Sequence, residues 1–252
     1  MKKRLDLILV ERGFFTTREK AKREIMAGNV IVNEQAVTKA GTGFKDTEKL
    51  FIRIKDRLKY VSRGGLKLEK AIKVWNLDFE KKTVLDVGAS TGGFTDCALQ
   101  HGATKVFSGD VGKNQLDWRL KNDGRVISLE EKHIKDLTSE ELDNEKVDIA
   151  VIDVSFISLT KVIPHLKKFL KKEGKIIMLI KPQFEVGRGK IGKNGIVLEE
   201  KYHDEAIKKI ISFVKEEGYT LFGIEMSPIK GTKGNVEFLA LIYLGDESHV
   251  NI

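Results

Sequence analysis

The stretch Thr83-Val84-Leu85-Asp86-Val87-Gly88-Ala89-Ser90-Thr91-Gly92-Gly93-Phe94 decides the fold. Its first five residues form an apolar run typical of a buried strand, and its glycine-rich end leads directly into a helical pattern over residues 94 to 100. Glycine lets a backbone turn tightly and approach a ligand closely. A strand, a glycine-rich loop and a helix in this order therefore indicate a ligand site at the carboxyl end of a strand in an open α/β sheet.

Strand and helix patterns alternate through the rest of residues 61 to 252. The further apolar runs that predict strands are Lys105 to Ser108, Val126 to Leu129, Val147 to Ile152, Lys175 to Ile180, Thr220 to Met226 and Glu237 to Tyr243. Helices are predicted for residues 66 to 75, 94 to 100, 159 to 170 and 202 to 214. This alternation predicts a doubly wound α/β domain with a seven-stranded sheet, spanning residues 61 to 252.

Positive charge is concentrated in the first 60 residues. The chain of 252 residues has a formal net charge of +8. Residues 1 to 60 hold 15 Lys/Arg and 8 Asp/Glu, a balance of +7, which leaves 30 against 29, or +1, for the remainder. Length and charge together predict a small basic domain over residues 1 to 60, with nucleic acid as one candidate partner and a solvated lysine-rich face as the alternative.

Several classes of protein are disfavoured by composition. Cys97 is the single cysteine, so an internal disulfide and a cysteine-rich zinc site are excluded, and no metal ion is expected. The apolar run at residues 5 to 10 contains an aspartate and lacks a cleavage site for secretion. No segment approaches the roughly 20 apolar residues that a membrane helix needs. The expected location is the cytoplasm.

The first domain is predicted to begin with two short helices. The first ends at Gly13, and Thr16-x-x-Glu19 reads as a capping box that opens the second, which runs to about residue 28. Residues 30 to 37 predict a hairpin, and residues 50 to 54 predict one more strand. On the second helix, Arg18, Lys22 and Arg23 point away from the apolar positions, which suits either phosphate contacts or a solvent-exposed face.

This first domain resembles the ribosomal protein S4-like RNA-binding domain. The resemblance rests on Arg4-Leu5-Asp6 with Leu9, on Thr17-Arg18-Glu19-x-Ala21, and on Ala27-Gly28-Asn29-Val30-x-Val32-Asn33. Glu34 stands where a glycine is usual, which affects the expected turn type. The resemblance implies an RNA-binding role for Arg4, Arg18, Lys22, Arg23 and, in the linker that follows, Arg63.

The glycine-rich loop carries acidic residues suited to a cofactor. Its spacing differs from the dinucleotide Gly-x-Gly-x-x-Gly pattern, and an acid at the start of the loop, Asp86, suits a cationic amino group. Asp110 follows the second strand and could accept hydrogen bonds from a ribose diol, or could form a turn. Glu130 follows the third strand near the expected adenine pocket, or could be a surface residue.

The loop sequence Gly-Ala-Ser-Thr-Gly-Gly-Phe-Thr-Asp is similar to that of the FtsJ-like ribose methyltransferases. The similarity implies that S-adenosylmethionine is bound by Asp86, Gly88, Ser90, Gly92 and Phe94.

That family uses a Lys-Asp-Lys-Glu tetrad, and each member matches a position in this chain. The four positions are Lys67 in Ser-Arg-Gly-Gly-Leu-Lys-Leu, Asp153 in Asp-Val-Ser-Phe-Ile-Ser, Lys181 in Lys-Pro-Gln-Phe-Glu-Val-Gly, and Glu237 in Gly-Asn-Val-Glu-Phe. A ribose hydroxyl is a poor nucleophile until a group positions it and removes its proton. We expect Lys181 to be the base and Asp153 to orient it, while Lys67 and Glu237 position the substrate.

Other methyltransferase chemistries fit less well. Cys97 lies on the first helix of the sheet domain, which is the wrong place for the nucleophile of a cytosine-carbon enzyme. The Asn/Asp-Pro-Pro-aromatic turn of exocyclic-amine enzymes is replaced by Asp153-Val154-Ser155-Phe156. A basic segment, residues 187 to 195, is either a flexible surface loop or a second RNA contact.

Over essentially the whole chain the sequence resembles the TlyA (hemolysin A) family. The resemblance implies ribose 2′-O-methylation of cytidine in 16S or 23S rRNA, with ribosomal RNA or ribosomal subunits as partners. Two alternatives remain, a membrane-active hemolysin and a non-catalytic rRNA-binding assembly factor.

Overall fold

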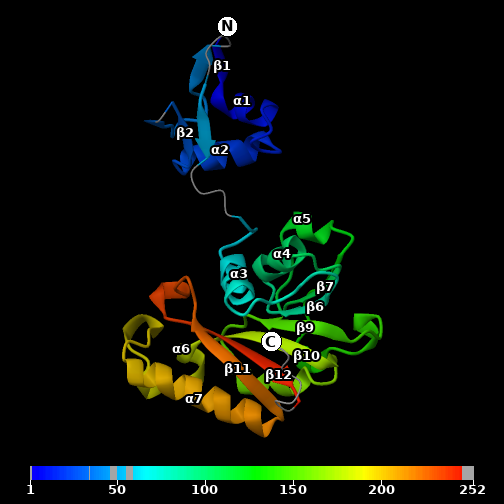
Figure 1. Ribbon diagram of the computed structural model, residues 1–252. Coiled ribbons are helices and arrows are strands. Elements are labelled where there is room, and N and C mark those ends of the chain that lie inside the picture. Colours follow the sequence, from blue (N-terminus) through cyan, green and yellow to red (C-terminus); the bar gives the residue numbers. More distant parts are fainter. Residues whose placement is uncertain (1, 34, 46–49, 55–58, 246–252) are drawn as a thin grey trace. The chain divides into compact units, whose positions relative to one another are not determined.

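The structure is a computed structural model that describes residues 2–33, 35–45, 50–54 and 59–245. The chain forms two compact units, Met1–Leu58 and Lys59–Ile252 (Figure 1). Each unit has its own apolar core, so each is described by itself.

The N-terminal unit contains the two expected helices, α1 (Leu5–Glu11) and α2 (Arg18–Met26). Its three-stranded sheet has the order β3 (Gln35–Ala36), β2 (Val30–Val32), β5 (Ile52–Ile54). The expected hairpin and third strand are present, although the turn residue 34 lies outside the described residues. Apolar side chains of both helices pack on β2 to form the core, which includes Leu5, Leu9, Ile25 and Val30.

Two features of this unit differ from expectation. Thr17, not Thr16, caps α2, because the Thr17 side chain accepts a hydrogen bond from the Lys20 backbone N–H at 3.3 Å. A further antiparallel pair joins β1 (Lys2–Arg4) to β4 (Gly43–Lys45). These strands are short and mostly exposed, so the alternation of apolar residues that identifies a strand is missing from them.

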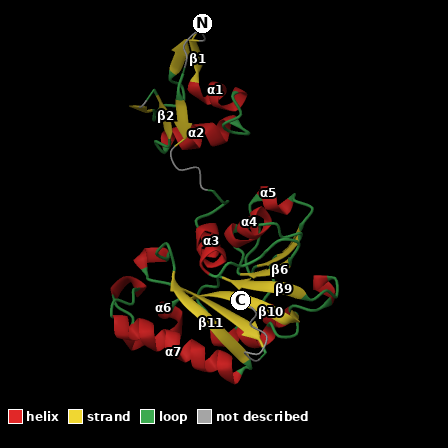
Figure 2. Ribbon diagram, in the orientation of Figure 1, coloured by secondary structure: helices red, strands yellow, loops and turns green. Residues whose placement is uncertain are grey.

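The C-terminal unit is built on the predicted seven-stranded sheet (Figure 2). Its strands, in order across the sheet, are β11 (Tyr219–Met226), β12 (Phe238–Leu244), β10 (Leu170–Ile180), β9 (Val147–Ile152), β6 (Thr83–Val87), β7 (Lys105–Gly109) and β8 (Val126–Leu129). Strand β12 runs antiparallel to both of its neighbours, β10 and β11, and the other paired strands of this sheet are parallel to each other. The predicted fold class, a Rossmann-like α/β domain preceded by a small α+β domain, is confirmed.

Helices cover both faces of this sheet (Figure 2). On one face α3 (Gly64–Val74), α4 (Gly93–Gln100) and α5 (Trp118–Lys121) contribute to a core that includes Val84 and Val151. On the other face α7 (Glu200–Glu216) contributes to a core that includes Leu85 and Ile152. Neighbouring residues of a central strand thus face opposite cores, which is why these strands are almost continuously apolar.

Residues 159–170 do not form the continuous helix that their spacing predicts. They form two short 3-10 helices, η3 (Leu159–Lys161) and η4 (Ile163–His165), followed by the start of β10 at Leu170. Pro164 has no backbone N–H and its ring obstructs the preceding turn, so a regular α-helix is interrupted there. The apolar residues of the segment are nevertheless buried in the core as the pattern implied.

Strand order brings four chain segments to one edge of the sheet. Strands β10, β9 and β6 are adjacent and parallel, so the loops after Ile180, Ile152 and Val87 meet at their carboxyl ends. Because β12 runs in the opposite direction, its first residue, Phe238, pairs with Ile180. The residue just before β12 therefore lies at the same edge.

Candidate active site

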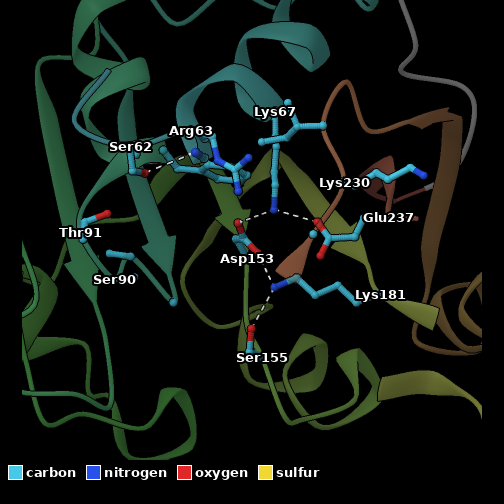
Figure 3. A pocket seen from close by; sticks show the side chains of 17 residues that line it. Ser62, Arg63, Lys67, Ser90, Thr91, Asp153, Ser155, Lys181, Lys230 and Glu237 are labelled. Atoms are coloured by element: carbon cyan, nitrogen blue, oxygen red, sulfur yellow. Dashed lines mark hydrogen bonds and ion pairs between the residues drawn. The ribbon is translucent and has the colours of Figure 1, made fainter. Parts of the chain in front are cut away.

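A pocket of about 310 Å³ opens at this edge of the sheet (Figure 3). Its walls come from the first turn of α3, the loop after β6, the residues after β9 and β10, and the segment before β12. The lining residues are Ser62, Arg63, Gly64, Lys67, Gly88, Ala89, Ser90, Thr91, Gly93, Phe94, Asp153, Ser155, Lys181, Ile229, Lys230, Gly231 and Glu237.

Four charged side chains form a continuous chain of ion pairs in this pocket (Figure 3). Lys181 Nζ lies 2.6 Å from Asp153 Oδ1, and Lys67 Nζ lies 3.2 Å from Asp153 Oδ2. Lys67 Nζ also lies 2.8 Å from Glu237 Oε2. The structure thus brings all four residues of the expected tetrad together in the alternating order lysine, aspartate, lysine, glutamate.

Burial and charge pairing fix the ionisation of two members. Burial would lower the pKa of Lys67, but Asp153 and Glu237 outweigh it, and the Lys67 pKa lies above its ordinary value. Burial would likewise raise the pKa of Asp153, but Lys181 and Lys67 hold it below its ordinary value. Lys67 is therefore a fixed cation and Asp153 a fixed anion near neutral pH, so neither is suited to accept a proton.

Lys181 is the tetrad lysine with a second, neutral partner. Its Nζ donates a hydrogen bond to Ser155 Oγ at 3.0 Å, and the residue is 7% exposed at the pocket wall. An ammonium group has three hydrogens, so the contacts to Asp153 and Ser155 leave one direction for a bound substrate.

Two glycines of the loop after β6 have conformations that require glycine. Gly88 has φ of +85°, and a Cβ there would lie 2.8 Å from the Asp153 carbonyl oxygen. Gly92 has φ of +93°, and a Cβ there would lie 2.2 Å from a methyl carbon of Leu120. Gly88 lines the pocket together with Ser90 and Phe94, whereas Gly92 does not line it and packs against Leu116 and Leu120. The loop can therefore pass close to the residues that follow β9.

Asp86 is fully buried beneath the loop and does not line the pocket. Its Oδ2 accepts hydrogen bonds from the Thr95 backbone N–H at 3.0 Å and the Thr95 hydroxyl at 2.7 Å. Its Oδ1 has no hydrogen-bond partner among the described residues. Burial raises the pKa of Asp86 to about 7.

The other two acidic residues expected near a cofactor bind the protein's own backbone or side chains. Asp110 accepts hydrogen bonds from the Ser90 N–H at 2.8 Å and the Gly112 N–H at 2.7 Å, so it shapes the glycine-rich loop. Glu130 pairs with Lys121 at 2.7 Å, and this contact lowers the Glu130 pKa. Neither residue lines the pocket.

The expected RNA-binding residues lie in different surroundings in the two units. In the N-terminal unit, Arg4 and Arg18 both bind the buried Asp6, at 3.0 and 3.1 Å, and the hydrogen bond from Arg4 is the main cause of the lowered Asp6 pKa. Lys22 pairs with Glu19 on the same helix, and Arg23 is exposed. In the C-terminal unit, exposed Arg63 lies beside Ser62 in the pocket wall (Figure 3).

Sequence reasoning missed part of the pocket wall, notably Ser155 and Lys230. It also missed Asn235, which is buried, donates a hydrogen bond to the Gly195 carbonyl at 2.9 Å and accepts one from the Val197 N–H at 3.0 Å. Asn235 thus ties the end of the basic segment 187–195 to the residues before Glu237. Its place two residues before the tetrad glutamate was the available signal.

The basic segment itself contains two short 3-10 helices, η5 (Arg188–Lys190) and η6 (Lys193–Gly195). Within the described ranges, no group of three or more His, Cys, Asp or Glu side chains is placed to hold a metal ion. In the same ranges, no helix is both long enough and apolar enough to cross a lipid bilayer.

Comparison with known proteins agrees with this geometry. Residues 3–47 match the S4 domain. Hemolysin A of Brachyspira hyodysenteriae is 44% identical over 94% of this chain and 98% of its own. The 16S/23S rRNA (cytidine-2′-O)-methyltransferase TlyA of Mycobacterium tuberculosis is 38% identical over 93% of this chain and 87% of its own.

A Streptococcus thermophilus protein of known structure superposes with a TM-score of 0.75 at 44% identity, covering 97% of this chain and 89% of the other. Residues 60–243, which include every residue of the pocket wall, match the FtsJ-like methyltransferase family. The chain belongs to the FtsJ-like methyltransferase family and carries an S4 domain at its N-terminal end.

Proposed function

We propose that this protein methylates the ribose 2′-hydroxyl of ribosomal RNA, with cytidine as the target nucleotide and S-adenosylmethionine as the methyl donor. The chain of ion pairs from Lys181 through Asp153 and Lys67 to Glu237 carries the proposal. The relative from Mycobacterium tuberculosis, whose name states cytidine 2′-O-methylation of rRNA, supports the choice of substrate.

The reaction requires removal of a proton from a hydroxyl that attacks a methyl carbon in line with its leaving group. Lys181, in its neutral form, would accept that proton at Nζ. Asp153, 2.6 Å away, would stabilise the ammonium that results, and Ser155 would hold Nζ in position. Lys67 is a fixed cation beside Asp153, where it can attract the developing alkoxide, and Glu237 offsets its charge.

The residues around the glycine-rich loop fit the proposed cofactor. When bound, S-adenosylmethionine would supply a methyl group on a sulfonium, which needs no Lewis acid to leave. Asp86 does not line the pocket, so we propose that the charge on its unpartnered carboxylate oxygen attracts the cofactor's amino group from beneath the loop. Gly88, Ser90 and Phe94 would line the cofactor's path. Asp110 and Glu130 have lone pairs left for ribose and adenine donors, and we propose these contacts for them.

Cofactor binding should tighten as pH rises toward neutrality. The free protein has a pKa of about 7 at Asp86, and the cofactor's ammonium favours the ionised carboxylate, so binding at lower pH must first release a proton. We expect the dissociation constant for S-adenosylhomocysteine to fall about tenfold between about pH 5.5 and about pH 7, measured by titration calorimetry. Asp86→Asn should make the affinity nearly independent of pH, and a flat profile for the parent would contradict the assignment.

We propose that residues 1–60 form the RNA-recruiting domain and residues 61–252 the catalytic domain. Arg4, Arg18, Lys22 and Arg23 would contact phosphates from α2 and the strand before α1, and Arg63 would do so at the pocket wall. Arg4, Arg18 and Lys22 can bind phosphates because their contacts with Asp6 and Glu19 leave other N–H donors free. The cytoplasm is the proposed location, since ribosomal RNA is there.

The exposed Arg23 provides a test of RNA recruitment. Arg23→Ala should reduce the slope of log affinity against log salt by about 1, because one phosphate contact is lost, and should leave methyl transfer at saturating RNA unchanged. Filter binding to rRNA fragments over a salt series measures this. Lys172→Ala, an exposed cation on the other unit, is the charge-matched control and should leave the slope as it is.

Ribose methylation mapping by mass spectrometry tests the proposed function directly. Unmodified subunits and free rRNA are incubated with the protein and S-adenosylmethionine, and a new 2′-O-methyl mark is the expected result. Absence of any mark on both substrates would leave an RNA-binding assembly factor. Leakage of liposomes in a parallel assay would instead support a membrane-active protein.

A further inference from the structure

The two loops that carry Asp153 and Lys181 contact each other at both ends. At the pocket, Lys181 Nζ lies 2.6 Å from Asp153 Oδ1. At the far end, Ser158 Oγ donates a hydrogen bond of 2.6 Å to Glu185 Oε2. Each of the sequence motifs Asp-Val-Ser-Phe-Ile-Ser and Lys-Pro-Gln-Phe-Glu therefore begins with a pocket residue and ends with a residue of the second contact, outside the pocket.

Glu185 is the centre of this second contact. It ends the short helix α6 (Pro182–Glu185), and its side chain is 1% exposed. The carboxylate also accepts hydrogen bonds from the Leu159 backbone N–H at 2.8 Å and from Lys209 Nζ at 3.0 Å, while Lys209 bonds the Glu185 carbonyl oxygen at 2.8 Å. A buried carboxylate is costly unless it is paired and fully hydrogen-bonded, and here it joins residues 158–159, α6 and α7.

The loop between the two contacts has a backbone that needs support. Phe156 has φ of +65°, which bulky side chains rarely adopt, and the residue is 91% exposed, so little packing holds it. The Phe184 ring, at 5.2 Å between centroids, is its aromatic neighbour. The Asp153 N–H donates to the Val87 carbonyl at 3.1 Å and fixes the start of the loop, while Glu185 fixes its end.

We propose that Glu185 is a positioning residue: it anchors residues 153–158 so that Asp153 and Ser155 hold the Lys181 amine toward the substrate. Glu185 touches neither substrate nor cofactor in this arrangement. Its effect passes through Ser158 and the strained backbone at Phe156 to Ser155. The kinetic part of the inference rests on the proposed methyl transfer.

Glu185→Gln tests this role, because glutamine keeps the shape but loses the charge. The matched control is Asp148→Asn, because the Asp148 carboxylate also accepts hydrogen bonds from a backbone N–H, that of Thr83 at 2.9 Å, and from a lysine, Lys171 at 2.7 Å. Asp148 lies at the amino end of β9, whereas the pocket lies at the carboxyl ends of the strands. We expect the single-turnover rate at saturating S-adenosylmethionine to fall about tenfold or more in Glu185→Gln and by less than about twofold in Asp148→Asn.

A double-mutant cycle separates positioning from general stability. Ser155→Ala should reduce the single-turnover rate by a clearly smaller factor in the Glu185→Gln background than in the parent, because the serine is already displaced there. Additive losses would overturn the proposal. Ser158→Ala removes a partner of Glu185 without altering the charge, so it serves if Glu185→Gln does not fold, and it should show the same non-additivity.

The reactivity of Lys181 gives a measurement that needs no RNA. Acetylation of Lys181 by acetic anhydride, quantified by peptide mass spectrometry, should become about threefold faster or more in Glu185→Gln and stay at the parental rate in Asp148→Asn. Equal rates in parent and Glu185→Gln would refute the positioning role. A parent that methylates no RNA would refute the proposed function, and the labelling result would still decide the role of Glu185.

Discussion

Lys181→Arg should lower the single-turnover rate of methyl transfer by about 10³-fold. Arginine keeps the positive charge and can still bond Asp153, but it does not lose its proton in proteins, so it cannot act as a base. Transfer of a labelled methyl group to rRNA, followed over a single turnover at saturating cofactor, measures the loss. Binding of S-adenosylhomocysteine should change little, because the loop that we propose to hold the cofactor follows β6, whereas Lys181 follows β10.

The control for this experiment is the same lysine-to-arginine change at an exposed position. Lys172 is exposed, and Lys172→Arg should retain the parental rate. If Lys181→Arg kept a rate within about tenfold of the parent, the lysine would be acting as a fixed charge and the proposed proton transfer would be wrong.

Asp153→Asn should impair both stability and catalysis. Lys67 and Lys181 are each 7% exposed, and Asp153 is the anion between them, so the substitution leaves two buried cations with one carboxylate. We expect a loss of about 3 kcal/mol in the free energy of unfolding, measured with urea, and about 10³-fold in the transfer rate. Asp123→Asn, which breaks an exposed pair with Arg125, should cost less than about 1 kcal/mol.

The pH dependence of this stability has a definite sign. The pKa of Asp153 in the folded protein lies below its unfolded value, so its contribution is fully present above the unfolded pKa of about 3.9 and is lost as pH falls through the lower, folded value. Asp86 titrates near pH 7 and is coupled to Asp153, so both proteins are compared in the Asp86→Asn background. The difference in unfolding free energy between this background and its Asp153→Asn variant should therefore be the same at about pH 5 and about pH 7. A difference that shrank in this range would show that Asp153 is not held ionised.

The strands of the sheet could be predicted because each is a short apolar run bounded by polar residues. Thr83–Val87, Val126–Leu129 and Val147–Ile152 have the predicted bounds. Apolar spacing reports burial more directly than it reports helix, which is why residues 159–170 are buried as expected while Pro164 prevents the expected α-helix.

The site could be predicted where topology decides it. Asp153 and Lys181 end adjacent parallel strands, so their proximity follows from the strand order. The partners of Asp86 and Asp110 could not be foreseen, because hydrogen bonds to Thr95 and Ser90 depend on the path of a single loop. Ser155 was missed for the same reason.

The reversed direction of β12 has a consequence for synthesis of the protein on the ribosome. Glu237 meets Lys67 across 170 residues of sequence, and β12 lies between β10 and β11 in the sheet. A nascent chain that still lacks β12 has only one of the two carboxylate partners of Lys67, Asp153, and no attachment for β11. The proposed catalytic centre is thus completed by a strand that is translated after β6, β9 and β10, so a product that stops before β12 should be inactive however well its earlier strands have folded.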